Sequence, residues 1–210
     1  MKYVERSRTP GRGPRRADFA RWGGVIAALL ALVLASPTFA QMPIRAITPD
    51  SITIYNFAKV NDRYFRGGQP MGDHYADLAA IGVKTVINLI GNEADIDRAE
   101  QSMVEQHGMR YVHIPMNTRQ APTDTEIAKF ISIVDDPNGG AVYVHCVGGR
   151  HRTGVMTAVY RMTKDGLSGD QAFKEMKQHK YGPDFLHPEF KKFVYQYQPK
   201  AAVAAAATQQ

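Results

Sequence analysis

The residues that could carry chemistry lie in one short segment, residues 145–154, which reads His-Cys-Val-Gly-Gly-Arg-His-Arg-Thr-Gly. The segment follows an apolar run typical of a strand and precedes a predicted helix, so its backbone N–H groups and the helix dipole favour an anion there. Gly148 and Gly149 let the backbone curl without Cβ clashes. Helix N-termini and nearby arginines lower cysteine pKa values, so Cys146 is predicted to be a thiolate nucleophile. Arg152 has the planar guanidinium that can bind two phosphate oxygens at once.

The order Cys146, five residues, Arg152 and Thr153 resembles the signature of the cysteine-dependent protein tyrosine and dual-specificity phosphatases. The resemblance extends over roughly residues 55–180 and is most specific in the loop. Plant and fungal members of the small atypical dual-specificity group, some of which act on inositol pyrophosphates, carry similar loops. The segments that resemble this group most closely are residues 64–70, 83–89 and 149–154.

This resemblance implies a role for each residue of the loop. Cys146 would attack phosphorus and form a phosphocysteine, which water then hydrolyses, while Arg152 would stabilise the equatorial oxygens. Thr153 would hydrogen-bond the sulfur, and His145 would hold the loop from behind. No metal and no cofactor is implied. The predicted substrate-binding residues, which present backbone N–H groups or positive charge, are Val147, Gly148, Gly149, Arg150, His151 and Thr153.

The family also uses a general acid, usually an aspartate on a loop after the strand before the long helix, and here the sequence departs from the pattern. With residues 111–115 on that strand, Thr118 stands at the position of the aspartate, and threonine is not an acid. Asp124 is the nearest carboxylate and the predicted catalytic acid, although an acidic residue at a helix start equally serves the helix dipole. Glu93 and Asp95 are the alternatives.

Strands alternate with helices along the chain, which predicts an α/β fold: a three-layer α/β/α phosphatase fold with a central, mainly parallel sheet. A Thr-x-x-Glu pattern beginning at Thr123 predicts a capped helix. The other predicted helices span residues 73–81, 95–107, 153–164, 168–179 and 188–197, and the predicted strands span residues 51–55, 63–66, 83–90, 110–114 and 141–145.

The basic charge is concentrated at the N-terminus. Residues 1–40 hold seven basic and two acidic side chains and so account for +5 of the formal net charge of +6. The near-neutral remainder argues against a nucleic-acid partner, because such binding depends on clustered Lys and Arg. The basic segment, the apolar run 23–35 and the small residues before Gln41 predict a signal peptide cleaved after Ala40. The predicted location is the periplasm or the exterior of a bacterium, with membrane attachment only if the leader stays uncleaved.

The predicted organisation follows from these signals: a signal peptide at 1–40, a linker at 41–50, a phosphatase domain at 51–198 and a flexible tail at 199–210. The chain has one cysteine, so an internal disulfide is excluded. The partner is expected to be a phosphorylated protein or small molecule, and the sequence does not define the oligomeric state.

The sequence predicts an exported phosphatase for phosphotyrosine-like or other phosphate monoesters. One alternative is an inositol polyphosphate or pyrophosphate phosphatase of the phytase type, which shares the loop. Another is a non-catalytic module that binds phosphorylated ligands, which the threonine at position 118 would favour. A rhodanese-type sulfur carrier ranks below these, because the loop ends in Arg-Thr-Gly.

Overall fold

The computed structural model describes residues 46–91 and 94–199. The predicted signal peptide, the tail from residue 200 onwards and Glu93 lie outside the described residues. Within these two described segments, no helix is both long and apolar enough to cross a membrane.

A five-stranded sheet forms the centre of the described chain, with the strand order β1-β2-β5-β3-β4. The pair β1–β2 is antiparallel, and the other three pairs are parallel. Strand β5 lies in the middle, and its residues Val142, Tyr143 and Val144 are all buried, as expected for a parallel strand covered on both faces. The strands are β1 (Ala58–Asn61), β2 (Tyr64–Gly67), β3 (Val83–Asn88), β4 (Arg110–His113) and β5 (Ala141–His145).

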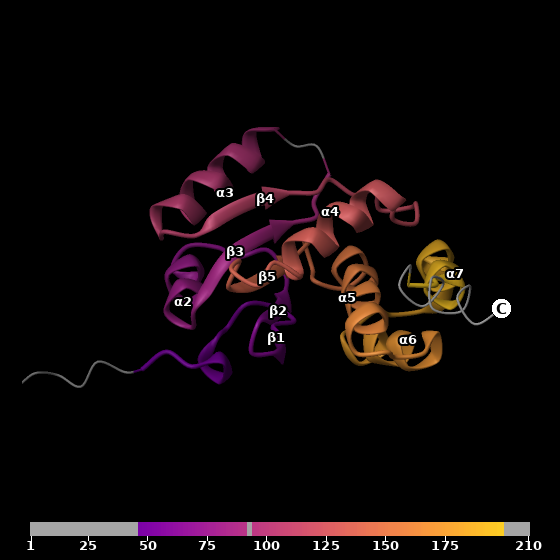
Figure 1. Ribbon diagram of the computed structural model, residues 1–210. Helices are drawn as coiled ribbons and strands as arrows, with labels where there is room; N and C mark the ends of the chain where they lie inside the picture. Colours follow the sequence, from indigo (N-terminus) through magenta and orange to yellow (C-terminus); the bar gives the residue numbers. More distant parts are fainter. Residues whose placement is uncertain (1–45, 92–93, 200–210) are drawn as a thin grey trace, which may run out of the picture. The chain divides into compact units, whose positions relative to one another are not determined.

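Helices cover both faces of this sheet (Figure 1). On one face, Leu78 of α2 packs with Val86 of β3 in one apolar cluster, and on the other, Phe130 of α4 packs with Met156 of α5 in a second cluster. The predicted three-layer α/β fold is therefore confirmed. The helices are α2 (His74–Ala80), α3 (Ala94–Gln106), α4 (Asp124–Val134), α5 (Arg152–Lys164), α6 (Gly169–Gln178) and α7 (Pro188–Gln196), with short 3-10 turns η1 (Pro49–Ser51) and η2 (Asp184–Leu186).

The predicted capping box at the start of α4 is confirmed. The Thr123 hydroxyl accepts from the Glu126 backbone N–H, and the Glu126 carboxylate accepts from the Thr123 N–H at 2.6 Å. This exchange satisfies two N–H groups that a helix start leaves without partners. It fixes the residue at which α4 begins, and with it the direction of every side chain on that helix.

The predicted strand at residues 51–55 is wrong. The chain there leaves the turn η1 and bends, and the first strand is β1, which begins only at Ala58. Ile54 is buried in the apolar cluster under α2, but the sheet edge beside β2 is already paired with β1. Residues 51–55 show the apolar alternation of a strand because Ile54 is buried, but the sheet offers them no strand to pair with.

Candidate active site

Cys146 is the first residue after β5, at the carboxyl edge of the sheet. In the parallel register, His145 of β5 lies opposite Gly67 of β2 and Asn88 of β3. The loops that follow these three strands therefore leave the sheet at the same edge, which is where parallel α/β sheets bind ligands. The strand–loop–helix arrangement predicted around Cys146 is confirmed, because α5 begins at Arg152.

Residues 146–151, hereafter the cysteine loop, curl against the turn that follows β2. Gly149 has a φ of +63°, and a Cβ there would lie 2.3 Å from the carbonyl carbon of Gly67. The carbonyl oxygen of Gly149 accepts from Asn56 Nδ2 at 2.8 Å and from the fully buried guanidinium of Arg66. These two contacts hold the loop through the Gly149 carbonyl oxygen, so they do not occupy the backbone N–H groups of the loop.

Replacing Gly149 by alanine is expected to lower the free energy of unfolding by roughly 2–3 kcal/mol, because a positive φ and a backbone clash coincide there. The matched control is Gly148→Ala in the same loop, where a Cβ would meet only the flexible side chain of Arg150 at 3.2 Å. Urea unfolding of both variants measures the difference. Equal stability of the two variants would contradict this account of the loop.

The sulfur of Cys146 is buried in a setting that favours its charged form. Burial alone would raise the pKa of the Cys146 thiol, but hydrogen bonds from the Thr153 hydroxyl and backbone N–H, the charge of Arg152 and the Gly149 N–H together lower it. The Thr153 hydroxyl is itself buried and is not engaged by any other group in the described part of the chain, so it is available to the Cys146 sulfur. The resemblance implies that this hydroxyl donates to the sulfur, and that role stays a prediction.

Two carbonyl groups hold the Arg152 guanidinium at the carboxyl edge of the sheet. Its side chain is only 8% exposed, and Nη1 donates to the carbonyl of Leu89 at 3.2 Å and to that of Met116 at 3.4 Å. Leu89 follows β3 and Met116 lies beyond β4, so the ends of two neighbouring strands hold the guanidinium. These contacts engage only one of its nitrogens, which leaves donors for an anion.

Most of the predicted site residues converge on one cavity of about 160 Å³. Gly149 and Thr153 do not line this cavity but support it from behind, through the contacts already described. Two residues from outside the cysteine loop and α5 complete the wall: Thr118, which stands at the position of the family's aspartate, and His187. The lining residues are Thr118, Cys146, Val147, Gly148, Arg150, His151, Arg152 and His187.

His145 is the last residue of β5, directly before the cysteine loop, and carries no exposed surface. Its Nε2 lies 2.9 Å from Oε1 of Glu100, and Oε2 of the same carboxylate accepts from Asn88 Nδ2 at 2.9 Å. Asn88 Oδ1 in turn accepts from the Ile90 N–H at 2.7 Å. This buried network ties the end of β5 to the end of β3 and so fixes the base of the site.

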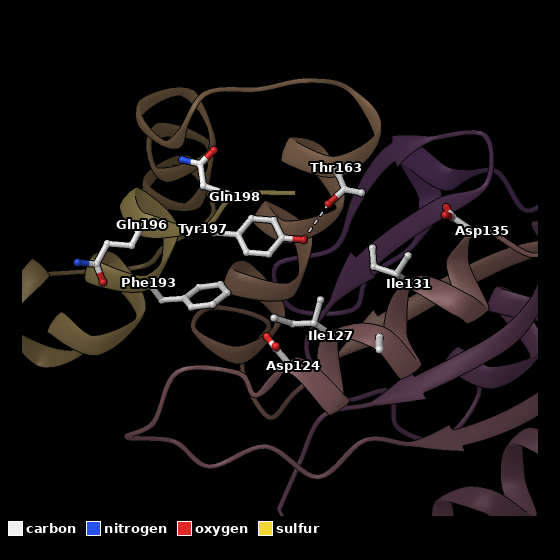
Figure 2. Close-up of a pocket in the computed structure, with 10 residues that line it drawn as sticks. Asp124, Ile127, Ile131, Asp135, Thr163, Phe193, Gln196, Tyr197 and Gln198 are labelled. Carbon is white, nitrogen blue, oxygen red and sulfur yellow. Dashed lines mark hydrogen bonds between the residues drawn. The ribbon is translucent and has the colours of Figure 1, made fainter. Parts of the chain in front are cut away.

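The structure does not bring the predicted general acid Asp124 to this cavity. Asp124 lines a separate pocket of about 490 Å³ between α4, α5 and α7 (Figure 2). The capping box begins α4 at Asp124, and the helical period then puts Asp124 on the same side as Ile127 and Ile131, which line that pocket too. Of the alternatives, Glu93 lies outside the described residues, and Asp95 lies in α3, where its side chain is not described.

Two contributors to the site escaped the sequence analysis. Asn56 supports the cysteine loop from a left-handed backbone conformation with a φ of 57°, a conformation that asparagine tolerates better than most residues. His187 reaches the cavity from just before α7, far along the chain from Cys146. The only local signal was the His-Pro pair, because proline is common at the first position of a helix.

The sequence matches the family described as "DSP-PTPase phosphatase fused to NAD+ Kinase" over residues 37–193. The dual specificity protein phosphatase TpbA of Pseudomonas aeruginosa strain UCBPP-PA14 is 28% identical over 162 residues, which cover 77% of this chain and 68% of that protein. The inositol diphosphatase DSP2 of rice, Oryza sativa subsp. japonica, is 26% identical over 110 residues, which cover 50% of this chain and 53% of that protein.

Solved structures share the fold. The crystal structure of P. aeruginosa TpbA superposes with a TM-score of 0.60 at 24% identity and covers 73% of this chain and 91% of that one. The catalytic domain of the PP-IP phosphatase SIW14 from S. cerevisiae gives a TM-score of 0.60 at 19% identity and covers 74% of this chain and 93% of that one. The family match spans most of the chain and includes the cysteine loop, so this protein belongs to the DSP-PTPase phosphatases and is a cysteine-dependent phosphatase of the dual-specificity type.

Proposed function

We propose that this protein hydrolyses phosphate monoesters through a phosphocysteine formed on Cys146. The observation that supports this most directly is the cavity that Cys146 and Arg152 line together, with the pKa of the thiol lowered against the effect of its burial. The thiolate is the nucleophilic form of cysteine. A guanidinium beside it holds the phosphate oxygens and stabilises the charge that develops on them in the transition state.

The reaction would proceed in two displacements. The Cys146 thiolate attacks phosphorus, so that an S–P bond forms and the P–O bond to the leaving alcohol breaks. Water then attacks the phosphocysteine, a new P–O bond forms, and the S–P bond breaks to release phosphate and the thiolate. The Thr153 hydroxyl favours the thiolate as it leaves. The leaving oxygen gains a proton in the first step and water loses one in the second, so the two steps balance.

Aryl phosphates of the phosphotyrosine type are the favoured substrates. Val147 lines the cavity and is 62% exposed, so it offers an apolar surface beside the mouth for an aromatic ring. The cavity of about 160 Å³ then holds the phosphoryl group, while the rest of a protein substrate stays outside. The C132S variant of P. aeruginosa TpbA, whose structure resembles this fold, has been crystallised in complex with pTyr.

An inositol polyphosphate or pyrophosphate is the second candidate substrate. Arg150 lines the cavity and is exposed, so its charge is available to a further phosphate group at the mouth. The names of two relatives support this candidate, the inositol diphosphatase DSP2 and the PP-IP phosphatase SIW14.

We also propose that the protein acts outside the cytoplasm of a bacterium. This rests on the sequence of residues 1–40, whose basic segment, apolar run and small residues before Gln41 have the pattern of a cleaved signal peptide. Cell fractionation and N-terminal sequencing of the mature protein would test it. A mature chain that begins at Gln41 in the periplasm is expected, and a cytoplasmic chain that begins at Met1 would contradict it.

The function itself is tested with the full chain, kept reduced in EDTA, on p-nitrophenyl phosphate. Turnover is expected without added metal, and iodoacetate should abolish it by adding one carboxymethyl group, because Cys146 is the only cysteine. Vanadate, a phosphate analogue, should protect the thiol. A folded chain that binds vanadate but does not turn over aryl or inositol phosphates would instead establish a phosphate-binding module.

A further inference from the structure

The first displacement in this cavity calls for a general acid. A poor leaving oxygen needs a proton as its bond to phosphorus breaks. Among the described residues that line the cavity there is no carboxylate, and its arginines do not lose protons near neutral pH. Apart from Cys146, the nucleophile, the lining residues that carry an imidazole, the side chain most often used as a general acid, are His151 and His187.

His151 is not suited to donate this proton. Its Nε2 lies 2.9 Å from the carbonyl oxygen of Tyr181, and because a carbonyl only accepts, the ring hydrogen on Nε2 is held there. Burial lowers the pKa of His151 despite the Tyr181 carbonyl, which raises it, and the charges of His187 and Arg150 lower it further. The ring is therefore neutral at pH 7, and its one hydrogen is already engaged.

In His187 the hydrogen-bonded ring nitrogen is Nδ1 rather than Nε2. Its Nδ1 lies 3.1 Å from the carbonyl oxygen of Thr118 and 3.2 Å from Oε1 of Glu189, and both of these groups accept. Nδ1 therefore carries a hydrogen. In the described part of the chain Nε2 makes no hydrogen bond, and the side chain, only 13% exposed, lines the cavity with Cys146. A second hydrogen on Nε2 would be available to a ligand in the cavity.

The position of this imidazole is fixed from several sides. The Arg119 guanidinium donates to the carbonyl of Leu186 at 2.6 Å, and the Tyr181 hydroxyl donates to the carbonyl of His187 itself. The ring packs on that of His151 with centroids 3.7 Å apart and on that of Phe190 at 5.7 Å. Such contacts hold the imidazole in one orientation, which a general acid requires.

We propose that His187, through Nε2, is the general acid of the first displacement and the general base of the second, an inference that rests on the proposed phosphatase function. As Cys146 attacks phosphorus, Nε2–H gives its proton to the leaving oxygen. The neutral ring that remains keeps its hydrogen on Nδ1 toward Thr118 and Glu189. Nε2 then takes a proton from the water that attacks the phosphocysteine, which restores the imidazolium.

The charges around His187 come from each element that contacts it. Glu189 of α7 is the acidic group in contact with His187, the basic groups around it are Arg119, Arg150 and Arg152, and the His151 ring packed on it is neutral at pH 7. A general acid acts only while it holds its proton, so kcat/KM for a poor leaving group should fall at basic pH. For p-nitrophenyl phosphate, whose leaving oxygen needs little protonation, that basic limb should be much weaker.

The test compares His187→Asn with the native chain on phenyl phosphate and p-nitrophenyl phosphate. An asparagine amide can keep a donor near the Nδ1 position but offers no acid at Nε2. The expected loss of kcat/KM is about 10²- to 10³-fold for phenyl phosphate and under about 10-fold for p-nitrophenyl phosphate. His107→Asn, at an exposed position beyond α3, is the matched control and should match the native chain on both substrates.

The outcomes separate this inference from the proposed function. Equal losses on both substrates, or no loss on either, would overturn the role of His187 while leaving Cys146 as the nucleophile. A native chain that hydrolyses neither of these substrates nor an inositol phosphate would instead overturn the proposed function. If His187→Asn does not fold, the pH profiles of the native chain decide: identical profiles for the two substrates would overturn the inference.

Discussion

Replacing Cys146 by serine is expected to reduce kcat on p-nitrophenyl phosphate by at least about 10⁴-fold, as the removal of a catalytic nucleophile does in other enzymes. The serine hydroxyl is not ionised at neutral pH, so the hydrogen bonds and charge that lower the pKa of the thiol no longer produce a nucleophile. The measurement is steady-state turnover of the reduced full chain in EDTA.

Binding is the control for this variant. The supports of the loop, from Asn56 and Arg66 to Gly149, do not involve the sulfur, so Cys146→Ser should fold and bind phosphate or vanadate as the native chain does. Calorimetry with phosphate measures that affinity. A serine variant that keeps turnover within about tenfold of the native chain would show that the nucleophile is not this thiol.

The part of the site that the sequence predicted is the part built from neighbouring residues. The apolar run of β5, the glycines and the helix that follows specify the cysteine loop locally, and the capping box of Thr123 and Glu126 likewise fixes the start of α4. These signals depend on backbone geometry and helix capping, which operate over a few residues. The local architecture around Cys146 was predictable for that reason.

The residues that face the loop from elsewhere were not predictable in this way. Proximity to Thr118 along the chain favours Asp124 as the acid, but Ile127 and Ile131 indicate that its side of α4 packs toward other helices. His187 comes from another part of the chain altogether. Its position in the cavity depends on how α7 packs on α5 and α6, and this tertiary packing cannot be read from neighbouring residues.

Substituting Arg152 by lysine is expected to lower kcat/KM for aryl phosphates by roughly 10³-fold, because a planar guanidinium that stabilises a transferring phosphoryl group is worth about that much. Lysine keeps the positive charge but presents a single nitrogen. That nitrogen cannot contact the carbonyls of Leu89 and Met116 and two phosphate oxygens with the same geometry. Steady-state kinetics on p-nitrophenyl phosphate measures the loss.

We expect the loss of kcat/KM in Arg152→Lys to reflect weaker stabilisation of the transition state and not a loss of folded protein. Arg152→Lys gives up two hydrogen bonds of 3.2 and 3.4 Å, so the free energy of unfolding should change by only about 1 kcal/mol. Arg110→Lys, at an exposed position of β4, makes the same substitution away from the cavity and should leave kcat/KM unchanged. If lysine at position 152 supports turnover as well as arginine does, charge alone is sufficient at this site, and the guanidinium does not hold two oxygens in the transition state.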